Sequence, residues 1–332
     1  MKILITGGLG YIGSHTTVEL IKEGYETVIV DDLSNSHLSV LEGIQNITGI
    51  RPEFYQNDLK DYENLLKVFK KENVDGVIHF AGFKAVGESV EKPLKYYENN
   101  IFSTINILKA MAQQNVNQIV FSSSATVYGE KNEPPFHESM PVNATNPYGQ
   151  TKKQIEEMLF DYETAMGGAI SVLRYFNPIG AHESGFIGEK PQGYPNNLMP
   201  FVLDVAKKKR DKLNVFGDDY DTPDGTGLRD YIHVVDLARG HVHALKFLND
   251  NSGFHIHNLG TGTPHSVLDV IQTFEKANGI SIPYKIVNRR PGDIAASFAN
   301  PSKAKKDLSW APKYSLNDMC KHAWQFMKKQ DG

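Results

Sequence analysis

Short apolar segments alternate with longer amphipathic segments through the first half of this chain. The apolar segments cover residues 2–6, 27–30, 53–55, 76–80, 118–122 and 170–175. Their hydrophobic residues are nearly consecutive, which is typical of strands buried on both faces. Helix-like periodicity fills residues 12–23, 62–71, 93–114 and 147–165. This β-α-β-α order predicts an α/β fold with a doubly wound parallel sheet and helices on both of its faces.

The pattern changes after about residue 176, where Gly and Pro become more frequent and the alternation weakens. We therefore predict a first unit over residues 1–176 and a smaller C-terminal α/β substrate-binding lobe over residues 177–332. The chain is free to cross back to the first unit after residue 230. Because no flexible linker separates the two halves, we expect them to pack around a shared cleft.

Composition excludes several classes of protein. The 332 residues carry a formal net charge of −4, which gives no reason to expect nucleic acid as a partner. No segment has the features of a secretion signal or the length of a membrane span, and the single cysteine, Cys320, cannot form an intramolecular disulfide. We expect a cytoplasmic protein that does not bind membranes.

A glycine-rich turn lies between the first apolar segment and the first helical one. Its residues are Gly7-Gly8-Leu9-Gly10-Tyr11-Ile12-Gly13. The spacing fits both Gly8-x-Gly10-x-x-Gly13 and Gly7-x-x-Gly10-x-x-Gly13. Glycine permits the tight turn and a close approach of the backbone to a pyrophosphate, which the following helix N-terminus attracts. The context, after a strand and before a helix, predicts a dinucleotide-binding site.

Acidic residues follow the second and third predicted strands. Asp31 and Asp32 lie 18 and 19 residues after Gly13, where a carboxylate meets the adenosine ribose hydroxyls. Because a carboxylate there repels a 2′-phosphate, we expect NAD in preference to NADP. Asp58 has two interpretations, a contact to the adenine edge or the N-cap of the helix that follows.

A candidate catalytic group follows the fifth predicted strand. Tyr148 and Lys152 are four residues apart, so on a helix their side chains share one face. A nearby ammonium and a cationic cofactor ring both favour the phenolate form of a tyrosine and lower its pKa. Ser122, Ser123 and Ser124 end the strand before them, and a hydroxyl there is placed to bind the substrate oxygen that loses its proton.

The order of glycine turn, acid, strand-end serine and Tyr-x-x-x-Lys resembles the extended short-chain dehydrogenase/reductase family. Longer strings resemble its UDP-glucose 4-epimerase branch, and the likeness runs from residue 1 to about residue 310. These strings begin His79-Phe80-Ala81-Gly82-Phe83-Lys84, Ser122-Ser123-Ser124-Ala125-Thr126, Arg174-Tyr175-Phe176-Asn177-Pro178, Pro195-Asn196-Asn197-Leu198, Gly227-Leu228-Arg229-Asp230-Tyr231 and Arg289-Arg290-Pro291-Gly292-Asp293.

The resemblance implies roles for individual residues. Ser124, Tyr148 and Lys152 would be catalytic. The implied NAD-binding residues are Gly7, Gly10, Tyr11, Ile12, Gly13, Asp31, Asp32, Leu33, Ser34, Asn35, Ser36, Asp58, Leu59, Phe80, Ala81, Gly82, Phe83, Lys84, Asn99, Ser122, Tyr148, Lys152 and Phe176. The implied UDP-sugar-binding residues are Lys84, Ser124, Tyr148, Asn177, Asn197, Leu198, Asn214, Val215, Phe216, Arg229, Arg290, Asp293 and Ser297.

The resemblance also implies a reaction. Tyr148 would take the proton of the sugar 4-hydroxyl while NAD accepts a hydride from C4, and the 4-keto sugar would turn before the hydride returns. Ser297 lies where restricted relatives have a tyrosine beside the sugar 2-substituent, so we expect UDP-N-acetylglucosamine and UDP-N-acetylgalactosamine to be substrates as well. Thr151 lies where a serine often precedes the lysine and keeps its hydroxyl.

Alternatives to an epimerase remain. A nucleotide-sugar 4,6-dehydratase or another nucleotide-sugar oxidoreductase shares the hydride step, but such dehydratases have Asp-Glu where this chain has Ala125-Thr126. A non-catalytic NAD-sensing regulator tends to lose the Tyr-x-x-x-Lys pair. No carboxylate or cysteine completes a ligand set around the paired histidines, so we expect no metal. A homodimer is expected, with the helices of residues 93–114 and 147–165 as candidate interface elements.

Overall fold

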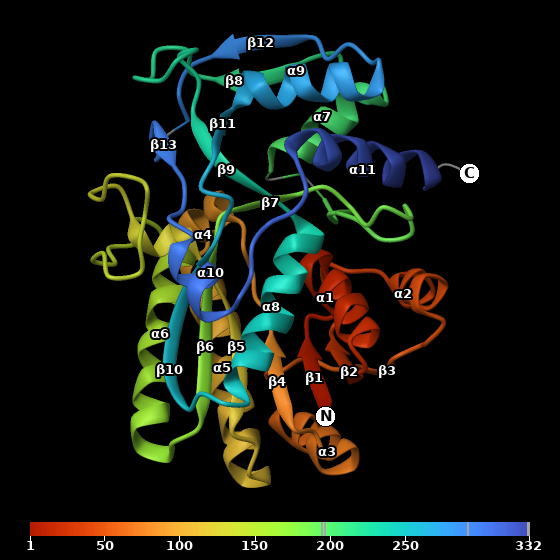
Figure 1. The fold of residues 1–332 in the computed structure, drawn as a ribbon, viewed down its shortest axis with the longest axis vertical. Helices are drawn as coiled ribbons and strands as arrows, with labels where there is room; N and C mark the ends of the chain where they lie inside the picture. The colour runs from red at the N-terminus through yellow and green to blue at the C-terminus, as the bar shows by residue number, and fades with distance from the viewer. Residues whose placement is uncertain (194, 196, 291, 331–332) are drawn as a thin grey trace.

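A seven-stranded parallel sheet forms the centre of the molecule (Figure 1). The computed structural model describes all residues except 194, 196, 291 and 331–332. The strand order is β10-β6-β5-β4-β1-β2-β3. These strands are β1 (Lys2–Thr6), β2 (Glu26–Asp31), β3 (Glu53–Gln56), β4 (Gly76–His79), β5 (Gln118–Ser124), β6 (Ala169–Tyr175) and β10 (Gly253–Leu259). The predicted doubly wound parallel sheet is confirmed.

Helices cover both faces of this sheet (Figure 1). One layer contains α1 (Tyr11–Lys22), α2 (Val40–Thr48) and α8 (Val234–Leu248). The second layer contains α3 (Tyr62–Glu72), α4 (Val86–Glu91), α5 (Pro93–Gln114) and α6 (Pro147–Met166). The four helices predicted from periodicity are present with ends within one residue, whereas α2 and α4 were not predicted.

Two apolar cores explain why the strands are hydrophobic at consecutive positions. Leu4 packs in the core beneath α3, α5 and α6, whereas Ile3 and Ile5 pack in the core beneath α1 and α8. All three side chains are fully buried. Because alternate side chains of a strand point to opposite faces, both sets must be apolar when helices cover both faces.

The smaller lobe lies over the carboxyl ends of the central strands (Figure 1). Its strands are β7 (Asn177–Ile179), β8 (Leu213–Phe216), β9 (Leu228–His233), β11 (Pro264–Ser266), β12 (Tyr284–Val287) and β13 (Ala296–Ser297). Its helices are α7 (Leu198–Ala206), α9 (Val267–Asn278) and α11 (Leu316–Lys329), and α10 (Ser302–Asp307) packs against β10 of the central sheet. Between the two groups of lobe strands, α8 and β10 return to the first unit.

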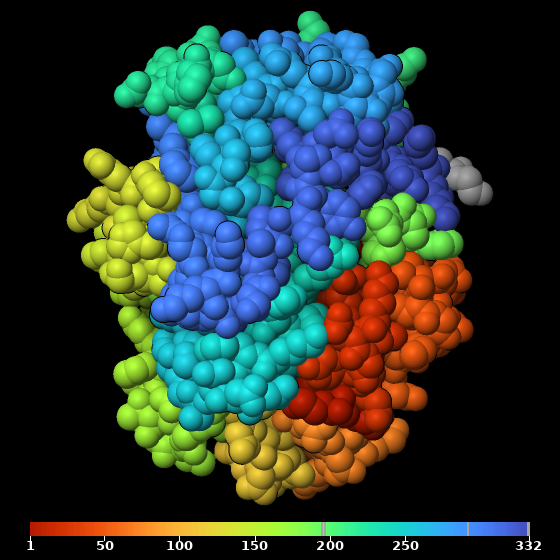
Figure 2. Space-filling view, viewed as in Figure 1, coloured from red at the N-terminus to blue at the C-terminus, as the bar shows by residue number. Residues whose placement is uncertain are grey.

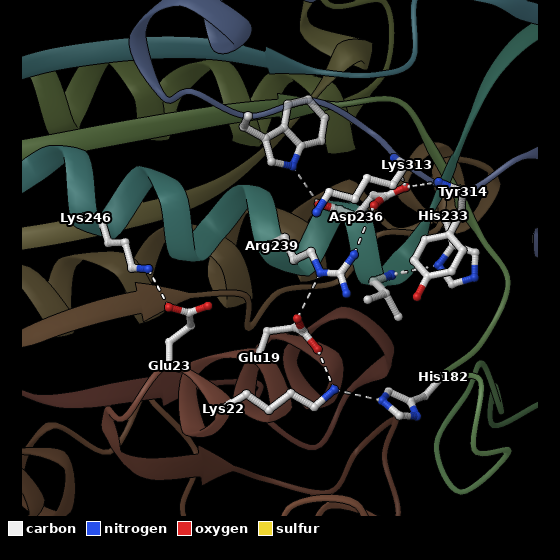
Figure 3. Close-up of polar contacts among 12 residues, drawn as sticks. Glu19, Lys22, Glu23, His182, His233, Asp236, Arg239, Lys246, Lys313 and Tyr314 are labelled. Atoms are coloured by element: carbon white, nitrogen blue, oxygen red, sulfur yellow. Dashed lines mark hydrogen bonds and ion pairs between the residues drawn. The ribbon is translucent and has the colours of Figure 1, made fainter.

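Charged residues join α1 to α8 and the C-terminal segment to α8 (Figure 3). The Nε atom of Arg239 on α8 donates to Glu19 on α1 at 3.1 Å. Asp236 accepts hydrogen bonds from the main-chain amides of Lys313 and Tyr314 at 2.8 and 2.9 Å. These bonds fix the segment that leads into α11 against the first unit, and the space-filling view shows this segment (blue) lying on α8 (Figure 2).

The described helices include none with the length and apolar character that crossing a membrane requires.

Candidate active site

A cavity of about 590 Å³ opens at the carboxyl ends of the central strands. Parallel α/β sheets bind their ligands at this edge. The smaller lobe contributes residues 186–192 and Asn197 to the cavity wall. Predicted cofactor residues in the wall are Gly7, Gly10, Tyr11, Ile12, Gly13, Asp31, Asp32, Ser34, Asn35, Ser36, Asp58, Leu59, Phe80, Ala81, Gly82, Phe83, Lys84, Asn99, Ser122, Tyr148 and Lys152.

Gly7 and Gly13 in the glycine turn have no space for side chains. A Cβ atom on Gly13 would lie 2.3 Å from the carbonyl oxygen of Gly7. A Cβ atom on Gly7, whose φ is +68°, would lie 2.8 Å from the amide nitrogen of Ala81. The N-cap of α1, Gly10, has no capping side chain, so the first amides of this helix face the cavity without a side-chain acceptor. This is the arrangement that binds a pyrophosphate.

Asp31 ties the end of β2 to the glycine turn. Its Oδ2 atom accepts a hydrogen bond from the amide of Leu9 at 3.0 Å, and its Oδ1 atom accepts from the amide of Leu33 and the hydroxyl of Ser36. Burial raises the pKa of the Asp31 carboxyl, and these hydrogen bonds oppose the rise. The adjacent Asp32 accepts a hydrogen bond from the amide of Ser34 at 2.8 Å, and both carboxylates keep oxygen lone pairs for ribose hydroxyls.

Asp58 lines the cavity, but its interpretation as a helix N-cap is wrong. The N-cap of α3 is Asp61, whose side chain accepts a hydrogen bond from the amide of Asn64. Asp58 instead accepts a hydrogen bond from the amide of Lys60 at 2.9 Å. The aspartate nearer to the start of α3 satisfies the first-turn amide, so Asp58 remains available to the cavity.

The three residues predicted to be catalytic come together where β5 ends and α6 begins. Tyr148 is the second residue of α6, and Ser124 ends β5. Burial raises the pKa of the Tyr148 hydroxyl, and a hydrogen bond with Ser124 lowers it. The Nζ atom of Lys152 donates to the carbonyl oxygen of Ser122 at 2.6 Å and lies 6.0 Å from the centre of the Tyr148 ring.

Burial lowers the pKa of Lys152 to about 7, and the charge of Glu156 opposes this effect. A lysine whose pKa is near 7 is close to half protonated at physiological pH. The pair can therefore move a proton between a buried tyrosine and its surroundings, which is the requirement for acid–base chemistry at a hydroxyl group.

A second group of predicted residues meets in the smaller lobe. Asp293 lies 2.8 Å from Arg290 and 3.8 Å from Arg229. The Arg290 guanidinium lies 5.9 Å from the ring centre of Phe216, and Ser297 pairs with Arg229 between β13 and β9. Two cations, one carboxylate, an aromatic ring and a small hydroxyl residue thus share one region, although none of them lines the cavity described above.

Several other predicted residues lie elsewhere. Leu33 and Phe176 do not line the cavity, and Phe176 packs 6.2 Å from the ring of Phe136 in an apolar cluster. The Val215 side chain is buried in the lobe core, so only its main chain is available to a ligand. Asn177 begins β7, Leu198 begins α7, and Asn214 is exposed on β8. Asn196 and Pro291, which belong to strings that carried the resemblance, lie outside the described residues.

Tyr175, Glu189 and Gln192 are among the cavity residues that were not predicted from the sequence. Tyr175 ends β6, and its hydroxyl is hydrogen-bonded to the Ser122 hydroxyl. Glu189 accepts hydrogen bonds from Asn197 at 2.9 Å and Lys84 at 3.4 Å. Gln192 donates from Nε2 to the carbonyl oxygen of Ser36 at 2.8 Å. Glu189 and Gln192 lie in a loop without periodicity. Tyr175 ends a strand whose residues are all buried, so no sequence pattern distinguishes it from its neighbours.

Comparison with known proteins agrees with this geometry. The family described as GDP-mannose 4,6 dehydratase matches residues 4–323. The UDP-glucose 4-epimerase of Bacillus subtilis is 54% identical over 327 residues, covering 98% of this chain and 96% of that protein. The chain belongs to the UDP-glucose 4-epimerase family.

Solved structures of the family have the same fold. The UDP-glucose 4-epimerase of Stenotrophomonas maltophila, with bound NAD and formylated UDP-arabinopyranose, has a TM-score of 0.97 at 48% identity and covers 100% of this chain and 99% of its own. The enzyme of Bifidobacterium longum, in complex with NAD+ and UDP, has a TM-score of 0.96 at 50% identity with the same coverage.

The site also bears on the dehydratase alternative. Ala125 and Thr126 open a short 3₁₀-helix directly after Ser124, and Thr126 donates to the Ser124 hydroxyl at 3.0 Å from its side chain. An alanine and a threonine supply no carboxyl group for the elimination of water. The match to the dehydratase family therefore reflects the shared fold and hydride chemistry.

Proposed function

We propose that this protein interconverts UDP-glucose and UDP-galactose by transient oxidation at C4 of the sugar, with NAD held in the cavity. The observation that carries the proposal is the position of Tyr148 and Lys152 in the wall of the cavity that also contains the glycine turn. Ser124 lies beside the Tyr148 hydroxyl. A proton-transfer group and a dinucleotide site at one edge of the sheet are what an alcohol oxidation requires.

The residues of the cavity fit NAD. Gly7 and Gly13 leave no room for side chains in the turn that precedes α1, and Asp31 and Asp32 offer oxygens to ribose hydroxyls. Among the described residues that line the cavity there is no arginine. A 2′-phosphate would therefore meet two carboxylates without a guanidinium to bind it, which supports NAD over NADP.

The protein side of the mechanism follows from the contacts of Tyr148. Bound NAD supplies the reversible hydride transfer at C4. Tyr148 accepts the proton of the 4-hydroxyl as phenolate, and Ser124 holds the same oxygen by a hydrogen bond. Because burial alone keeps Tyr148 protonated, the Lys152 ammonium and the charge of the cofactor supply the electrostatic stabilisation of the phenolate. Tyr148 returns the proton when the 4-keto sugar is reduced on its opposite face.

The contacts of residues 186–192 support slow release of the cofactor. Gln192 joins this loop to the adenosine side of the cavity through the carbonyl of Ser36 and the side chain of Asn35. A loop bound at both walls of a cavity restricts the exit of a ligand. A reaction without net redox change needs the same cofactor in every turnover, so slow release of NAD is an advantage.

The smaller lobe supplies groups for the nucleotide. Arg229 and Arg290 share Asp293, which keeps their two guanidinium groups close together. Guanidinium groups bind phosphate oxygens through two parallel hydrogen bonds. The exposed ring of Phe216 offers a stacking surface for a base. These features support a nucleoside-diphosphate sugar as the substrate.

Ser297 supports a broader substrate range that includes UDP-N-acetylglucosamine and UDP-N-acetylgalactosamine. It lies on the two-residue strand β13, paired with Arg229 of the proposed diphosphate site. A serine leaves more volume than a tyrosine for the acetamido group at C2 of the sugar. A pocket with additional volume accepts the larger of two related substrates, whereas a filled pocket excludes it.

The helices α5 and α6 pack against each other, and both carry exposed apolar side chains. These side chains support a homodimer. Leu94 and Phe102 on α5 are 79% and 54% exposed, and Phe160 on α6 is 53% exposed. Exposed apolar groups on two long adjacent helices are typical of a four-helix interface between two copies of a chain. Sedimentation of the protein and of F102E tests this: a dimer that the charge dissociates supports the interface, and a monomeric wild-type protein contradicts it.

The activity is tested with purified protein and no added NAD. UDP-galactose and UDP-N-acetylgalactosamine are incubated separately, and their C4 epimers are separated and quantified over time. Formation of both epimers supports the function, the resident cofactor and the broad range together. Formation of UDP-glucose alone contradicts the broad range, and formation of a 4-keto-6-deoxy sugar contradicts the epimerase assignment.

A further inference from the structure

Five buried residues are joined by hydrogen bonds in a line that runs from the end of β1, next to the glycine turn, to the main-chain carbonyl of Tyr148. They are Thr6 at the end of β1, His79 at the end of β4, Thr104 and Asn100 on α5, and Thr151 on α6. Each is at most 1% exposed. The mechanism proposed above uses none of them, and burial of so many polar groups is costly unless each one is paired.

Asn100 is the centre of this line. Its Oδ1 atom accepts from the amide of Phe83 at 2.8 Å and from the side chain of Asn99 at 3.2 Å. Its Nδ2 atom donates to the carbonyl of Phe83 at 3.1 Å and to the hydroxyl of Thr151 at 3.1 Å. The side chain thus uses all four hydrogen-bonding positions of an amide. The paired bonds to Phe83 determine which end of the amide is oxygen.

Between β1 and Asn100, each group donates a hydrogen bond to the next group along the line. The Thr104 hydroxyl donates to the carbonyl of Asn100 at 2.9 Å, so it must accept from Nε2 of His79, 3.1 Å away. A neutral imidazole that donates from Nε2 accepts at Nδ1, and the Thr6 hydroxyl lies 2.7 Å from that atom. Burial lowers the pKa of His79 to about 3, which keeps the ring neutral.

Thr151 connects Asn100 to the first turn of α6. Its hydroxyl accepts from Asn100 and donates to the main-chain carbonyl of Tyr148 at 2.8 Å. Phe83 belongs to the cavity segment of residues 80–84, whose main chain faces the glycine turn. One amide and one hydroxyl therefore join the cofactor wall to the residue proposed to take the proton.

We propose that Asn100 and Thr151 are positioning residues that hold Tyr148 at a fixed distance from the cofactor segment of residues 80–84. The inference rests on the proposed function, because the distance matters only if Tyr148 and the cofactor act on one substrate carbon. Both residues act through main-chain atoms of Phe83 and Tyr148 and touch no reacting atom. A displacement of about 1 Å between reacting groups reduces a rate by on the order of 100-fold.

The test is T151V, which keeps the shape of the side chain and removes its hydroxyl, compared with T151S, which keeps the hydroxyl. The matched control is T164V on the same helix, where an exposed threonine hydroxyl donates to the carbonyl of Phe160. We expect T151V to lower kcat for UDP-galactose by about 10- to 100-fold with KM changed by less than about threefold. We expect T151S and T164V to stay within about twofold of the wild type in kcat.

A second readout does not depend on turnover. In T151V the side-chain amide of Asn100 loses one acceptor, which weakens its hold on the main-chain amide of Phe83. We therefore expect faster hydrogen exchange in the peptide that contains Phe83, with NAD content unchanged. T164V is expected to leave exchange in that peptide unchanged. A purely structural role would lower the melting temperature and leave kcat of the folded, NAD-loaded protein intact.

The outcomes separate the two proposals. An inactive wild-type protein contradicts the proposed function. An active wild type with T151V within about twofold in kcat overturns the positioning role, as does an equal loss in T151V and T151S. Loss in T151V, recovery in T151S and faster exchange at Phe83 support it.

Discussion

The Nζ atom of Lys152 lies 2.6 Å from the main-chain carbonyl oxygen of Ser122. A carbonyl holds the ammonium group without neutralising its charge, so the charge remains effective at Tyr148 on the same helix face. Glu156, one turn further along α6, is paired with Arg174 at 2.5 Å, and its negative charge favours the protonated form of Lys152. The protonated form of Lys152 therefore places a positive charge near the tyrosine in a buried site, where electrostatic interactions are strong.

Removal of the Tyr148 hydroxyl tests the proton-transfer step. We expect Y148F to lower kcat for UDP-galactose by about 100- to 10,000-fold, the usual contribution of a positioned acid–base group. Retention of NAD and binding of UDP should persist, because the ring and the cavity are unchanged. Tyr162 lies on the same helix and outside the cavity wall, so Y162F is the matched control. Full activity in Y148F would falsify the role of this residue.

Stability should depend on pH through Lys152. Its pKa is about 7 in the folded protein and its ordinary value is 10.5, so between these values the unfolded chain binds the proton and the folded protein releases it. Stability from this group therefore rises as pH increases from about 7 toward 10.5, by at most about 1.4 kcal/mol per pH unit, and is constant below that window.

The comparison of the wild type with K152M isolates this effect. K152M should have its largest stability advantage at and below about pH 7, and the advantage should shrink as pH rises. Urea unfolding at several pH values, with NAD at a fixed saturating concentration, measures the difference. K153M, at a partly exposed neighbouring position, is the control and should show no such trend. A difference between the wild type and K152M that is independent of pH contradicts the prediction.

The buried pair of Glu156 and Arg174 should be costly to break on one side. Glu156 accepts three bonds from Arg174, at 2.5 to 3.2 Å, and one from the Ser123 hydroxyl at 2.5 Å. E156Q leaves a buried guanidinium without a counter-ion, so we expect a loss of about 3–5 kcal/mol in the free energy of unfolding. The double variant E156M/R174M removes both charges and should recover most of that loss.

Urea unfolding measures both variants, provided that the denaturant slope stays constant. E157Q is the control, because Glu157 is exposed and pairs with Lys153 at 3.6 Å; we expect a change below about 1 kcal/mol. If E156M/R174M is no more stable than E156Q, the cost comes from lost packing and the electrostatic explanation is wrong.

The central sheet was predictable because burial of its strands on both faces leaves a pattern in consecutive residues. Leu4 and its neighbours Ile3 and Ile5 face different cores, so burial on both faces appears in the sequence as an uninterrupted apolar run. The glycine turn was predictable for a similar reason, since the steric limits at Gly7 and Gly13 exclude every larger residue.

The unpredicted parts depend on contacts between distant segments. Asn100 bonds to Phe83 and Thr151, 17 and 51 residues away, and no local pattern indicates such partners. Gln192 reaches Ser36 across 156 residues from a loop without periodicity. The two interpretations of Asp58 could not be separated from the sequence, because Asp58 and Asp61 both precede α3 and only the geometry of the turn decides which of them is the N-cap.

Ser297 provides a direct test of substrate range. S297Y fills the space proposed for the acetamido group, and overpacking of a site costs about 1–3 kcal/mol. We expect kcat/KM for UDP-N-acetylgalactosamine to fall by about 5- to 150-fold, with a much smaller change for UDP-galactose, which has only a hydroxyl at C2. S297A keeps the side chain small and should retain both activities. Parallel steady-state assays with the two substrates measure the ratio. An equal loss for both substrates in S297Y would mean that the tyrosine disturbs the adjacent strand and Arg229, and that residue 297 does not select the sugar.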